Sequence, residues 1–241
     1  GKTTTLYAVL QLLNTPERNI VTVEDPVEYR LDGIAQVQVR QIAGMTFASA
    51  LRSIVRQDPD VILVGEIRDL ETAEIAIGAA QTGHLVLSTL HTNDAAGAIS
   101  RLINLGVPPY LVASAVLGTV AQRLIRVICS KCKQTYQPSE DQVSFLLGKS
   151  YRDKKLELYR GAGCESCNHT GYLGRKSIYE ILPISPQILR MIINGDYDHA
   201  IINQQAVKEG MKSLYERAVA EVLNGQTTLD ELMRVVEVRE S

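Results

Sequence analysis

The sequence predicts an α/β fold in which helices cover both faces of a parallel β-sheet. Over the first two-thirds of the chain, short apolar segments of strand length alternate with longer segments that have helical periodicity. One short segment, Val61–Val64, is entirely apolar and mostly β-branched, which is typical of a central parallel strand. Strands that alternate with helices imply crossover connections and therefore a parallel sheet.

The elements of this sheet are expected in a regular order. Thr46 is the expected cap of the second helix, Gly83 ends the third, and Gly106 separates the last two. We expect strands at residues 19–23, 35–39, 61–64 and 85–90, and helices at residues 2–13, 47–56, 70–82, 94–105 and 110–124. Ligands of such sheets bind at the carboxyl ends of the strands, so the residues that follow each strand are candidates for a site.

Beyond residue 124 the pattern changes. Residues 125–182 are rich in cysteine, glycine and charge, with one short helix expected at residues 140–147. From residue 185 onward the chain reads as helical, most clearly at residues 213–223 and 228–235. The sequence therefore predicts a second, smaller module and a helical end.

Composition and charge exclude some classes of function. The net charge of −2 argues against a protein that mainly grips nucleic acid. Residues 123–176 nevertheless hold 11 Lys or Arg and 5 Asp or Glu, a net charge of +6, which leaves −8 elsewhere. This basic stretch could meet an acidic partner or an anionic membrane surface, or it could be an ordinary solvated face.

No segment of the sequence is expected to cross a membrane. The most apolar run, residues 112–121, is too short and is interrupted by Ser114 and Gly118. No signal peptide opens the sequence, so a cytoplasmic location is the default expectation.

Gly1, Lys2 and Thr3 have the residue types that end a phosphate-binding loop, G-x-x-x-x-G-K-[ST]. In that motif the lysine neutralises phosphate charge and the hydroxyl binds Mg²⁺, at the start of a helix. The tripeptide alone is a weak signal. The assignment to a phosphate-binding loop is strengthened because the tripeptide opens a predicted helix and because acidic residues follow later predicted strands.

Carboxylates follow two of the predicted strands. Glu66 follows Val61–Val64 and Gly65, as in a Walker B element that orients Mg²⁺ through water; the alternative is a strand cap paired with Arg68. Glu24 and Asp25 follow the first strand and suit activation of water for attack on a phosphate; the alternative is a charged turn before a proline.

Two histidines flank the predicted strand at residues 85–90. His84 precedes this strand and His91 follows it. Either histidine could sense the terminal phosphate of a nucleotide. The alternative for each is an ordinary surface or helix-capping residue.

Four cysteines form two C-x-x-C pairs, and they are the strongest local signal in the sequence. Four thiolates at this spacing match tetrahedral Zn²⁺ with no open position, which predicts a structural rather than a catalytic metal. The pairs consist of Cys129 with Cys132 and Cys164 with Cys167. Redox use of the thiols is a weaker reading, and a structural disulfide is weaker still.

Four segments together resemble the type II secretion and type IV pilus assembly ATPases, in the same order along the chain. The resemblance extends from residue 1 to about residue 235. The segments are TVEDPVEY, RQDPDVILVGEIRDLETAEIA, TGHLVLSTLHTNDAAGAISRL and GCESCNHTGYLGRKSIYEIL.

The resemblance implies a RecA-like P-loop ATPase core with an inserted zinc module. It assigns ATP and Mg²⁺ as ligands, with Gly1, Lys2 and Thr3 in the Walker A box and Thr3 and Glu66 toward magnesium. Glu24 is implied as the catalytic glutamate, beside Asp25 in the aspartate box. His84 and His91 form the histidine box, in which we expect His91 to act in catalysis and His84 toward the nucleotide. The four cysteines, Cys129, Cys132, Cys164 and Cys167, match the zinc module of the secretion and pilus-extension members.

On this basis we divide the chain into three parts. A truncated ATPase core is expected at residues 1–128, a tetracysteine module with its return strand at residues 129–182, and a helical subdomain at residues 183–241. The first part of the phosphate loop and the family's N-terminal domain, which supplies arginines to the phosphate, lie outside this sequence. We therefore expect a C-terminal fragment that begins inside the Walker A motif and is inactive in isolation.

The function that the resemblance implies is an ATP-hydrolysing homohexameric motor for pseudopilus or pilus assembly. Its implied partners are an inner-membrane platform protein and associated assembly proteins at the cytoplasmic face of the bacterial inner membrane, with no specific nucleic acid. Members that retract pili typically lack the zinc module, which favours assembly. One alternative is a pilus-retraction motor. Another is a DNA-transport motor, which DNA-stimulated hydrolysis would favour, and a third is a non-enzymatic zinc-binding adaptor.

Overall fold

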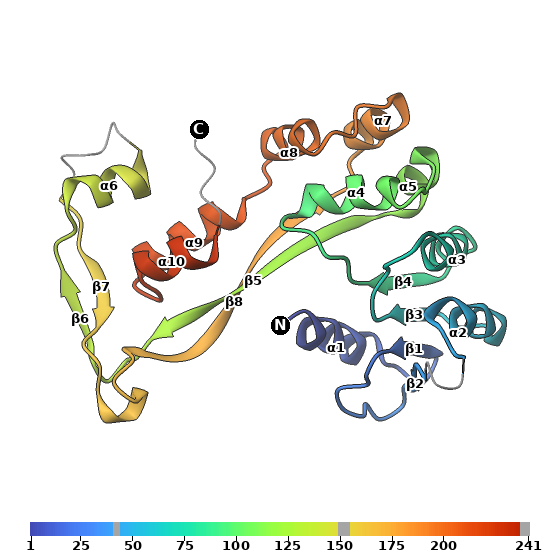
Figure 1. Cartoon of the computed structure of the whole chain (residues 1–241), viewed down its shortest axis with the longest axis horizontal. Helices are drawn as coiled ribbons and strands as arrows, with labels where there is room; N and C mark the ends of the chain where they lie inside the picture. The colour runs from blue at the N-terminus through green and yellow to red at the C-terminus, as the bar shows by residue number, and fades with distance from the viewer. Residues whose placement is uncertain (41–43, 149–154, 237–241) are drawn as a thin grey trace. The chain divides into compact units, whose positions relative to one another are not determined.

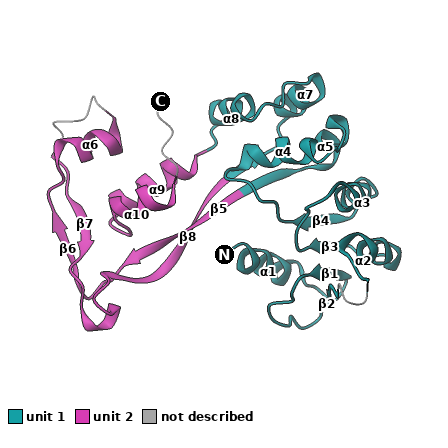
Figure 2. Cartoon of the chain, in the orientation of Figure 1, with its two compact units in different colours: residues 1–120, 181–211 teal, residues 121–180, 212–241 magenta. Residues whose placement is uncertain are grey.

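A computed structural model of the chain describes residues 1–40, 44–148 and 155–236, and its elements are labelled in Figure 1. The chain forms two compact units, which Figure 2 distinguishes by colour. Unit 1 comprises residues 1–120 and 181–211, and unit 2 comprises residues 121–180 and 212–241.

Unit 1 is built on a four-stranded sheet with the strand order β2-β1-β3-β4. The strands are β1 (Ile20–Glu24), β2 (Ala35–Gln38), β3 (Val61–Val64) and β4 (Leu85–Ser88). All neighbouring strands are parallel, which confirms the predicted fold class. Every residue of β1 and β3 is buried, as expected of central strands covered on both faces.

Seven α-helices of unit 1 are described around this sheet. They are α1 (Lys2–Leu13), α2 (Phe47–Ile54), α3 (Leu70–Gln81), α4 (Ala95–Asn104), α5 (Pro109–Ala115), α7 (Pro186–Asn194) and α8 (His199–Lys208). A 3-10 turn, η2 (Val55–Gln57), extends α2. Helix α5 packs on α7 and α4 packs on α8, so C-terminal helices complete the packing of unit 1.

Side-chain caps fix where several of these helices begin. In each case an oxygen at the N-cap accepts a hydrogen bond from the backbone N–H three residues later, which contributes about 1 kcal/mol. The caps are Thr46 for α2, Asp69 for α3, Asp94 for α4 and Ser185 for α7. The predicted cap Thr46 is confirmed.

Helix α1 packs against the sheet through one apolar face. Its residues Tyr7 and Leu10 are fully buried in a cluster with Ile20 of β1 and with Val61 and Leu63 of β3. This burial fixes the direction of the helix, and with it the position of the residues at the helix start.

The described part of unit 2 contains three α-helices, one small two-stranded sheet and most of a second, of which residues 118–120 and 181–183 belong to unit 1. One sheet pairs β5 (Gly118–Ile128) with β8 (Tyr172–Pro183), and the other pairs β6 (Lys133–Tyr136) antiparallel with β7 (Leu158–Gly161). The helices are α6 (Glu140–Leu147), α9 (Leu214–Leu223) and α10 (Leu229–Val235). The Tyr215 hydroxyl donates a 2.7 Å hydrogen bond to the Phe145 carbonyl, which ties α9 to α6.

The helix predicted at residues 110–124 is wrong beyond Ala115. Strand β5 begins at Gly118, and a Cβ at that position would lie 3.0 Å from the Leu182 carbonyl oxygen of β8. The error has a physical origin, because the apolar residues Val112, Val116, Val120 and Leu124 recur at spacings of four, which imitates a helix.

The division at residues 128 and 182 stays a prediction, and the compact units group the helices differently. Helices α7 and α8 belong to unit 1, whereas α9 and α10 belong to unit 2. Among the helices that the structure describes, none has both the length and the apolar character required to cross a membrane.

Candidate functional site

The parallel register brings the ends of three strands to one edge of the sheet. Val23 of β1 pairs with Val64 of β3, which in turn pairs with Ser88 of β4. The residues that follow these positions are Glu24, Gly65 and Thr89, so these three residues lie at a single edge, as expected for an α/β sheet.

A cavity of about 250 Å³ opens at this edge, within unit 1. It collects six of the residues that the sequence predicts for nucleotide chemistry, namely Lys2, Thr3, Glu24, Asp25, Glu66 and His91. A larger hollow of about 660 Å³ lies along β2 and is lined by none of these six residues. We therefore take the smaller cavity as the candidate site.

Lys2 and Thr3 reach the cavity because they open α1. Gly1 is the N-cap residue of this helix and makes no side-chain cap. The first backbone N–H groups of a helix have no partner within the helix, and they favour an anion at that end. The start of α1 therefore supplies a cation, a hydroxyl and helix N–H groups at one point.

Glu24 is buried at the floor of the cavity, and three donors hold its carboxylate. Tyr7 of α1 donates a short hydrogen bond to Oε2. The Thr22 hydroxyl donates to Oε1 at 2.6 Å, and the Gln36 amide donates to the same oxygen at 3.3 Å. Burial and the neighbouring Glu24 carboxylate raise the pKa of Tyr7 to about 12, so its hydroxyl stays protonated.

Glu66 is held between Arg68 and His91. Its carboxylate pairs with the Arg68 guanidinium and lies 3.0 Å from Nε2 of His91. Burial opposes ionisation of Glu66, but the hydrogen bonds and charges of Arg68 and His91 outweigh it and lower its pKa. Glu66 is therefore an anion near neutral pH, and the pairing with Arg68 left open by the sequence is present.

The side of the cavity at Glu66 is open. The Glu66 side chain is 12% exposed, whereas its partners Arg68 and His91 are 66% and 69% exposed. Asp25 is likewise exposed. Exposed cations can move away at little energetic cost, so a ligand can reach the Glu66 carboxylate from solvent.

Gly65 lets β1 and β3 approach closely beside the cavity. A Cβ at Gly65 would lie 3.3 Å from the Val23 carbonyl oxygen and 3.4 Å from Cα of Glu24. The Gly65 N–H donates to that carbonyl at 2.8 Å, and the Thr89 hydroxyl donates to the Gly65 carbonyl at 2.8 Å. These contacts lock the two acidic strand ends together.

His84 is not among the residues that line this cavity. It precedes β4, at the amino end of the strand, whereas the cavity lies at the carboxyl end. Its Nδ1 lies 2.8 Å from the Ala79 carbonyl oxygen near the end of α3. His84 thus contacts the end of α3, which is the helix-capping alternative that the sequence left open. Nucleotide binding by His84 stays a prediction, and the lining of this cavity does not support it.

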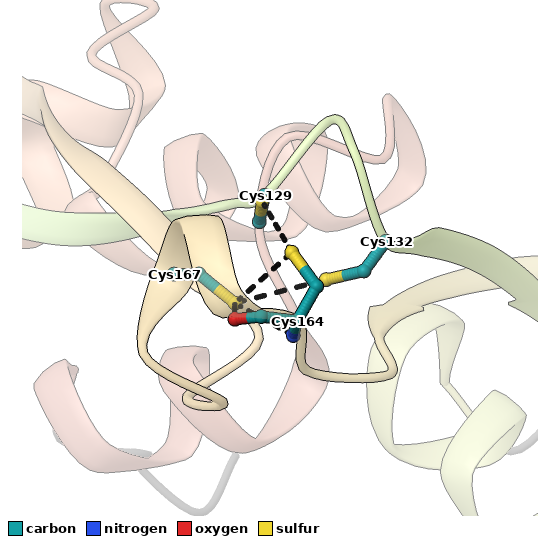
Figure 3. Close-up of side chains that lie close together, drawn as sticks. All are labelled: Cys129, Cys132, Cys164 and Cys167. Carbon is teal, nitrogen blue, oxygen red and sulfur yellow. Dashed lines mark hydrogen bonds between the residues drawn. The ribbon is translucent and has the colours of Figure 1, made fainter.

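The four cysteines lie close together, as Figure 3 shows. All four belong to unit 2. Cys129 follows β5 and Cys132 precedes β6, while Cys164 and Cys167 bracket the 3-10 turn η4 (Glu165–Cys167). Their sulfur atoms all lie within 4.8 Å of one another.

The sulfur spacing fits a tetrahedral ion rather than disulfides. The separations are 3.9 Å for Cys129–Cys164, 3.9 Å for Cys132–Cys167 and 3.8 Å for Cys164–Cys167. Zinc–sulfur bonds of about 2.3 Å in a tetrahedron put sulfur atoms about 3.8 Å apart. A disulfide would need about 2.05 Å, and all four cysteines are free.

Backbone donors support a thiolate at Cys167. Its sulfur accepts hydrogen bonds from the backbone N–H of Cys164 at 3.2 Å and of Gly171 at 3.3 Å. These donors lower the pKa of the Cys167 thiol to about 6. A metal ligand must be deprotonated, so the donor set suits Zn²⁺.

The sequence did not predict the residues that hold Glu24. Tyr7 reads as one more apolar position on a helix, and Thr22 and Gln36 read as strand residues. A buried tyrosine usually needs a partner for its hydroxyl, which is the signal that could have pointed to Tyr7.

Comparisons with known proteins agree on one family. The family model described as "Type II/IV secretion system protein" matches residues 1–234. The chain is 48% identical over 239 residues to the type II secretion system ATPase E of Vibrio cholerae serotype O1, covering 98% of this chain and 46% of that protein. It is 47% identical over 236 residues to the type IV pilus assembly ATPase PilB of Myxococcus xanthus, covering 97% of this chain and 41% of that protein.

Solved structures show the same fold. The pilus retraction motor PilT with bound ADP superposes with a TM-score of 0.70 at 28% identity, covering 97% of this chain and 57% of that one. The Legionella pneumophila ATPase DotB superposes with a TM-score of 0.69 at 21% identity, covering 97% and 56%, a likeness of fold alone. The chain spans about half the length of the curated relatives it matches.

Proposed function

We propose an ATP-hydrolysing assembly motor as the function of the full-length protein, since this chain belongs to the type II/IV secretion system protein family. The observation that carries the proposal is the convergence of Lys2, Glu24, Glu66 and His91 on one cavity at the carboxyl edge of a parallel sheet. A phosphate-binding helix start opposite two acidic strand ends is the arrangement that phosphoryl transfer requires.

Different residues of the cavity have different proposed roles in hydrolysis. Lys2 and the start of α1 would bind the phosphates, and Thr3 with Glu66 would hold Mg²⁺, whose preferred ligands are hydroxyl, carboxylate and water oxygens. The bound ion would neutralise charge on the phosphates. Glu24 would orient and deprotonate the attacking water, because its carboxylate is fixed and faces the cavity.

His91 and Arg68 would respond to the ligand. Both contact Glu66, and both are more than half exposed. Engagement of Glu66 with a hydrated ion would compete with these pairs and free His91 toward the phosphate. The proposed role of His91 is therefore to link occupancy of the cavity to the segment between β4 and α4.

Substitution of Glu24 tests this function in the full-length protein. We predict that Glu24→Gln retains ATP binding but lowers turnover by about 10²-fold or more, because a general base typically contributes 10²–10⁴-fold. Lys2→Ala should instead weaken ATP binding itself. The matched control is Glu74→Gln, an exposed position on α3, which should hydrolyse ATP as wild type does. Unchanged turnover in Glu24→Gln would refute the assignment and favour a non-enzymatic adaptor.

Assembly of filaments is the proposed use of the hydrolysis. Relatives with identities of 47–48% are named for type II secretion or type IV pilus assembly. The proposed working form is a homohexamer at the cytoplasmic face of the bacterial inner membrane, with a platform protein as its partner. The open side of the cavity supports a ring, since a neighbouring subunit or another domain can complete the site. The mass of the assembled protein in solution tests the hexamer.

Zinc is the proposed occupant of the cysteine cluster. The support is the sulfur spacing near 3.8 Å together with the backbone donors to Cys167. Four thiolates complete a tetrahedron and leave no position for substrate, so the ion would be structural. Cys129, Cys132, Cys164 and Cys167 would each supply one sulfur ligand.

A further inference from the structure

Glu24 is not a free carboxylate in this fold. An ionised carboxylate offers about four lone-pair sites for hydrogen bonds. Tyr7, Thr22 and Gln36 donate to it and occupy three such sites, two on Oε1 and one on Oε2. The group is therefore fixed in orientation, with room for about one further donor, such as a water molecule in the cavity.

These three donors come from three different elements. Thr22 lies on β1 with Glu24 itself, and Gln36 lies on the neighbouring β2. Tyr7 lies on α1, the helix whose first residues Lys2 and Thr3 line the same cavity. The Tyr7 hydroxyl thus links two parts of the site by one hydrogen bond. It connects α1, whose start is proposed to bind phosphate, to the Glu24 carboxylate, which is proposed to orient the attacking water.

The surroundings of Tyr7 direct its hydroxyl proton to the Glu24 carboxylate. The side chain is fully buried, and its oxygen accepts the backbone N–H of Glu28 at 3.3 Å, which leaves its own proton for Glu24. With a pKa near 12 the hydroxyl keeps that proton throughout the physiological range. Tyr7 therefore orients Glu24 and does not exchange protons with it.

Building on the proposed function, we infer that Tyr7 is a positioning residue that holds the Glu24 carboxylate in line with the start of α1. If Tyr7 served packing alone, its ring would suffice, since the ring already packs edge-on against Tyr29 with centroids 4.7 Å apart. The inference concerns the hydroxyl, which packing does not need. Its loss should disturb the catalytic step more than the binding of ATP.

Tyr7→Phe in the full-length protein separates the hydroxyl from the ring. We expect kcat for ATP hydrolysis to fall about 10-fold, while KM and ATP affinity change less than about 2-fold. In a Glu24→Gln background, single-turnover measurements should show no further fall on adding Tyr7→Phe, because the two groups act as one unit. The matched control is Tyr29→Phe, which removes a hydroxyl from the neighbouring ring and should leave kcat unchanged.

A second variant covers the case in which Tyr7→Phe does not fold. Thr22→Val removes the 2.6 Å donor to Oε1 and keeps the side-chain shape, so it should also lower kcat with little effect on KM. The inference is overturned if Tyr7→Phe turns over as wild type does, or if it loses the same factor in both backgrounds. If the wild-type protein does not hydrolyse ATP, both the proposed function and this inference are refuted. If Tyr7→Phe hydrolyses ATP at the wild-type rate while Glu24→Gln is inactive, only this inference is refuted.

Discussion

Glu231 is a buried charge of unit 2 that is held by two arginines. Its side chain is fully buried, and it accepts hydrogen bonds from the Arg126 backbone N–H at 2.9 Å, from Arg126 Nε at 2.8 Å and from Arg234 Nε at 2.8 Å. Arg126 also stacks 4.0 Å from the ring centroid of Tyr172. One carboxylate therefore joins β5 to α10, and through Arg126 also to β8.

Replacing Glu231 should destabilise the protein in a pH-dependent way. Burial disfavours the charge of Glu231, but hydrogen bonds from Arg234 and Arg126 prevail and lower its pKa from 4.5 to about 2. Because the pKa of Glu231 is lower in the folded than in the unfolded protein, the ionised side chain stabilises the fold at pH values above about 4.5. This stabilisation is lost as the pH falls toward 2. We predict that Glu231→Gln costs about 2–4 kcal/mol at pH 7, because charged hydrogen bonds are lost and two arginines keep no counter-charge.

Urea unfolding of both proteins between pH 7 and pH 3 measures this prediction. The difference in unfolding free energy between wild type and variant should narrow as the pH falls below about 4.5. The control is Glu140→Gln, an exposed residue at the start of α6, which should show only a small effect at every pH. A difference that stays constant down to pH 3 would mean that the charge of Glu231 is not what stabilises the fold.

Several candidate-site residues could be predicted from the sequence because they lie at the ends of predicted strands or at the start of a predicted helix. Lys2, Glu24, Glu66 and His91 follow recognisable strand or helix boundaries, and a parallel sheet brings such boundaries together. The contact of Tyr7 with Glu24 was not predictable, because it spans 17 residues; likewise, in unit 2, the pairing of Glu231 with Arg126 spans 105 residues. His84, which the family resemblance assigns to the nucleotide, is not among the residues that line the cavity, and its role stays a prediction.

At the scale of elements, β5 shows where periodicity misleads. Its burial pattern resembles that of a helix, yet its content of β-branched residues, including Thr119, Val120 and Val127, favours a strand. Strand β8, 54 residues later, supplies the pairing partner. Helix propensity over a short window carries no information about a partner so distant, so tertiary pairing prevailed.

The cysteine module also depends on contacts that span its sequence. The Cys129 N–H donates to the Gly171 carbonyl at 3.0 Å, and the Ala162 N–H donates to the Cys132 carbonyl at 2.9 Å. A Cβ on Gly161 would lie 2.1 Å from the Gly171 carbonyl oxygen, so this approach requires glycine. The proposed zinc ion would add a further link between these loops, as structural metals do in small modules.

Removing zinc should therefore unfold the module locally. Structural zinc contributes on the order of 10 kcal/mol to the folding of such sites. We predict that a chelator, or Cys129→Ser, removes about one zinc ion per chain and exposes the amides of Cys132 and Ala162 to hydrogen exchange. Amides of β1 and β3 in unit 1 should remain protected. Ser130→Ala, within the same C-x-x-C pair, is the control and should retain zinc.

Three outcomes would count against the zinc assignment. Metal analysis that finds no zinc in freshly purified, reduced protein would leave the cysteines without their proposed ligand. Persistent protection of Cys132 and Ala162 after complete chelation would show that the loops are stable without metal. A disulfide between any of the four thiols in protein prepared under reducing conditions would equally favour the redox reading.

At the scale of the whole molecule, the candidate site and the basic stretch belong to different units. The cavity that holds Lys2, Glu24 and Glu66 lies in unit 1, whereas residues 123–176 lie in unit 2. The chain is slightly acidic overall, at −2, but that stretch carries +6. Unit 1 thus holds the site proposed for hydrolysis, whereas unit 2 holds a basic stretch whose charge suits an acidic partner.

The whole-molecule prediction concerns which surface of this chain would meet the proposed platform partner. Lys131, Lys133 and Arg160 are exposed around the cysteine module, where Lys133 lies over the Tyr159 ring and Arg160 over the Tyr136 ring. We predict that reversing these three charges to Glu in the full-length protein weakens binding of the platform's cytoplasmic part at least 10-fold at low salt. Complementary charge mainly accelerates association, so wild-type affinity should itself fall as salt rises, and the variant should respond less.

The controls for this prediction separate docking from folding and catalysis. The charge-reversed protein should keep its zinc and its basal ATP turnover, because none of the three residues lines the cavity or ligates the metal. Reversing Arg101, Lys208 and Arg217, which are exposed elsewhere, changes the net charge equally and should leave binding nearly intact. If both triple variants lose the same affinity, the partner senses only net charge. If neither loses any, the basic stretch is an ordinary solvated face, and the platform binds another surface.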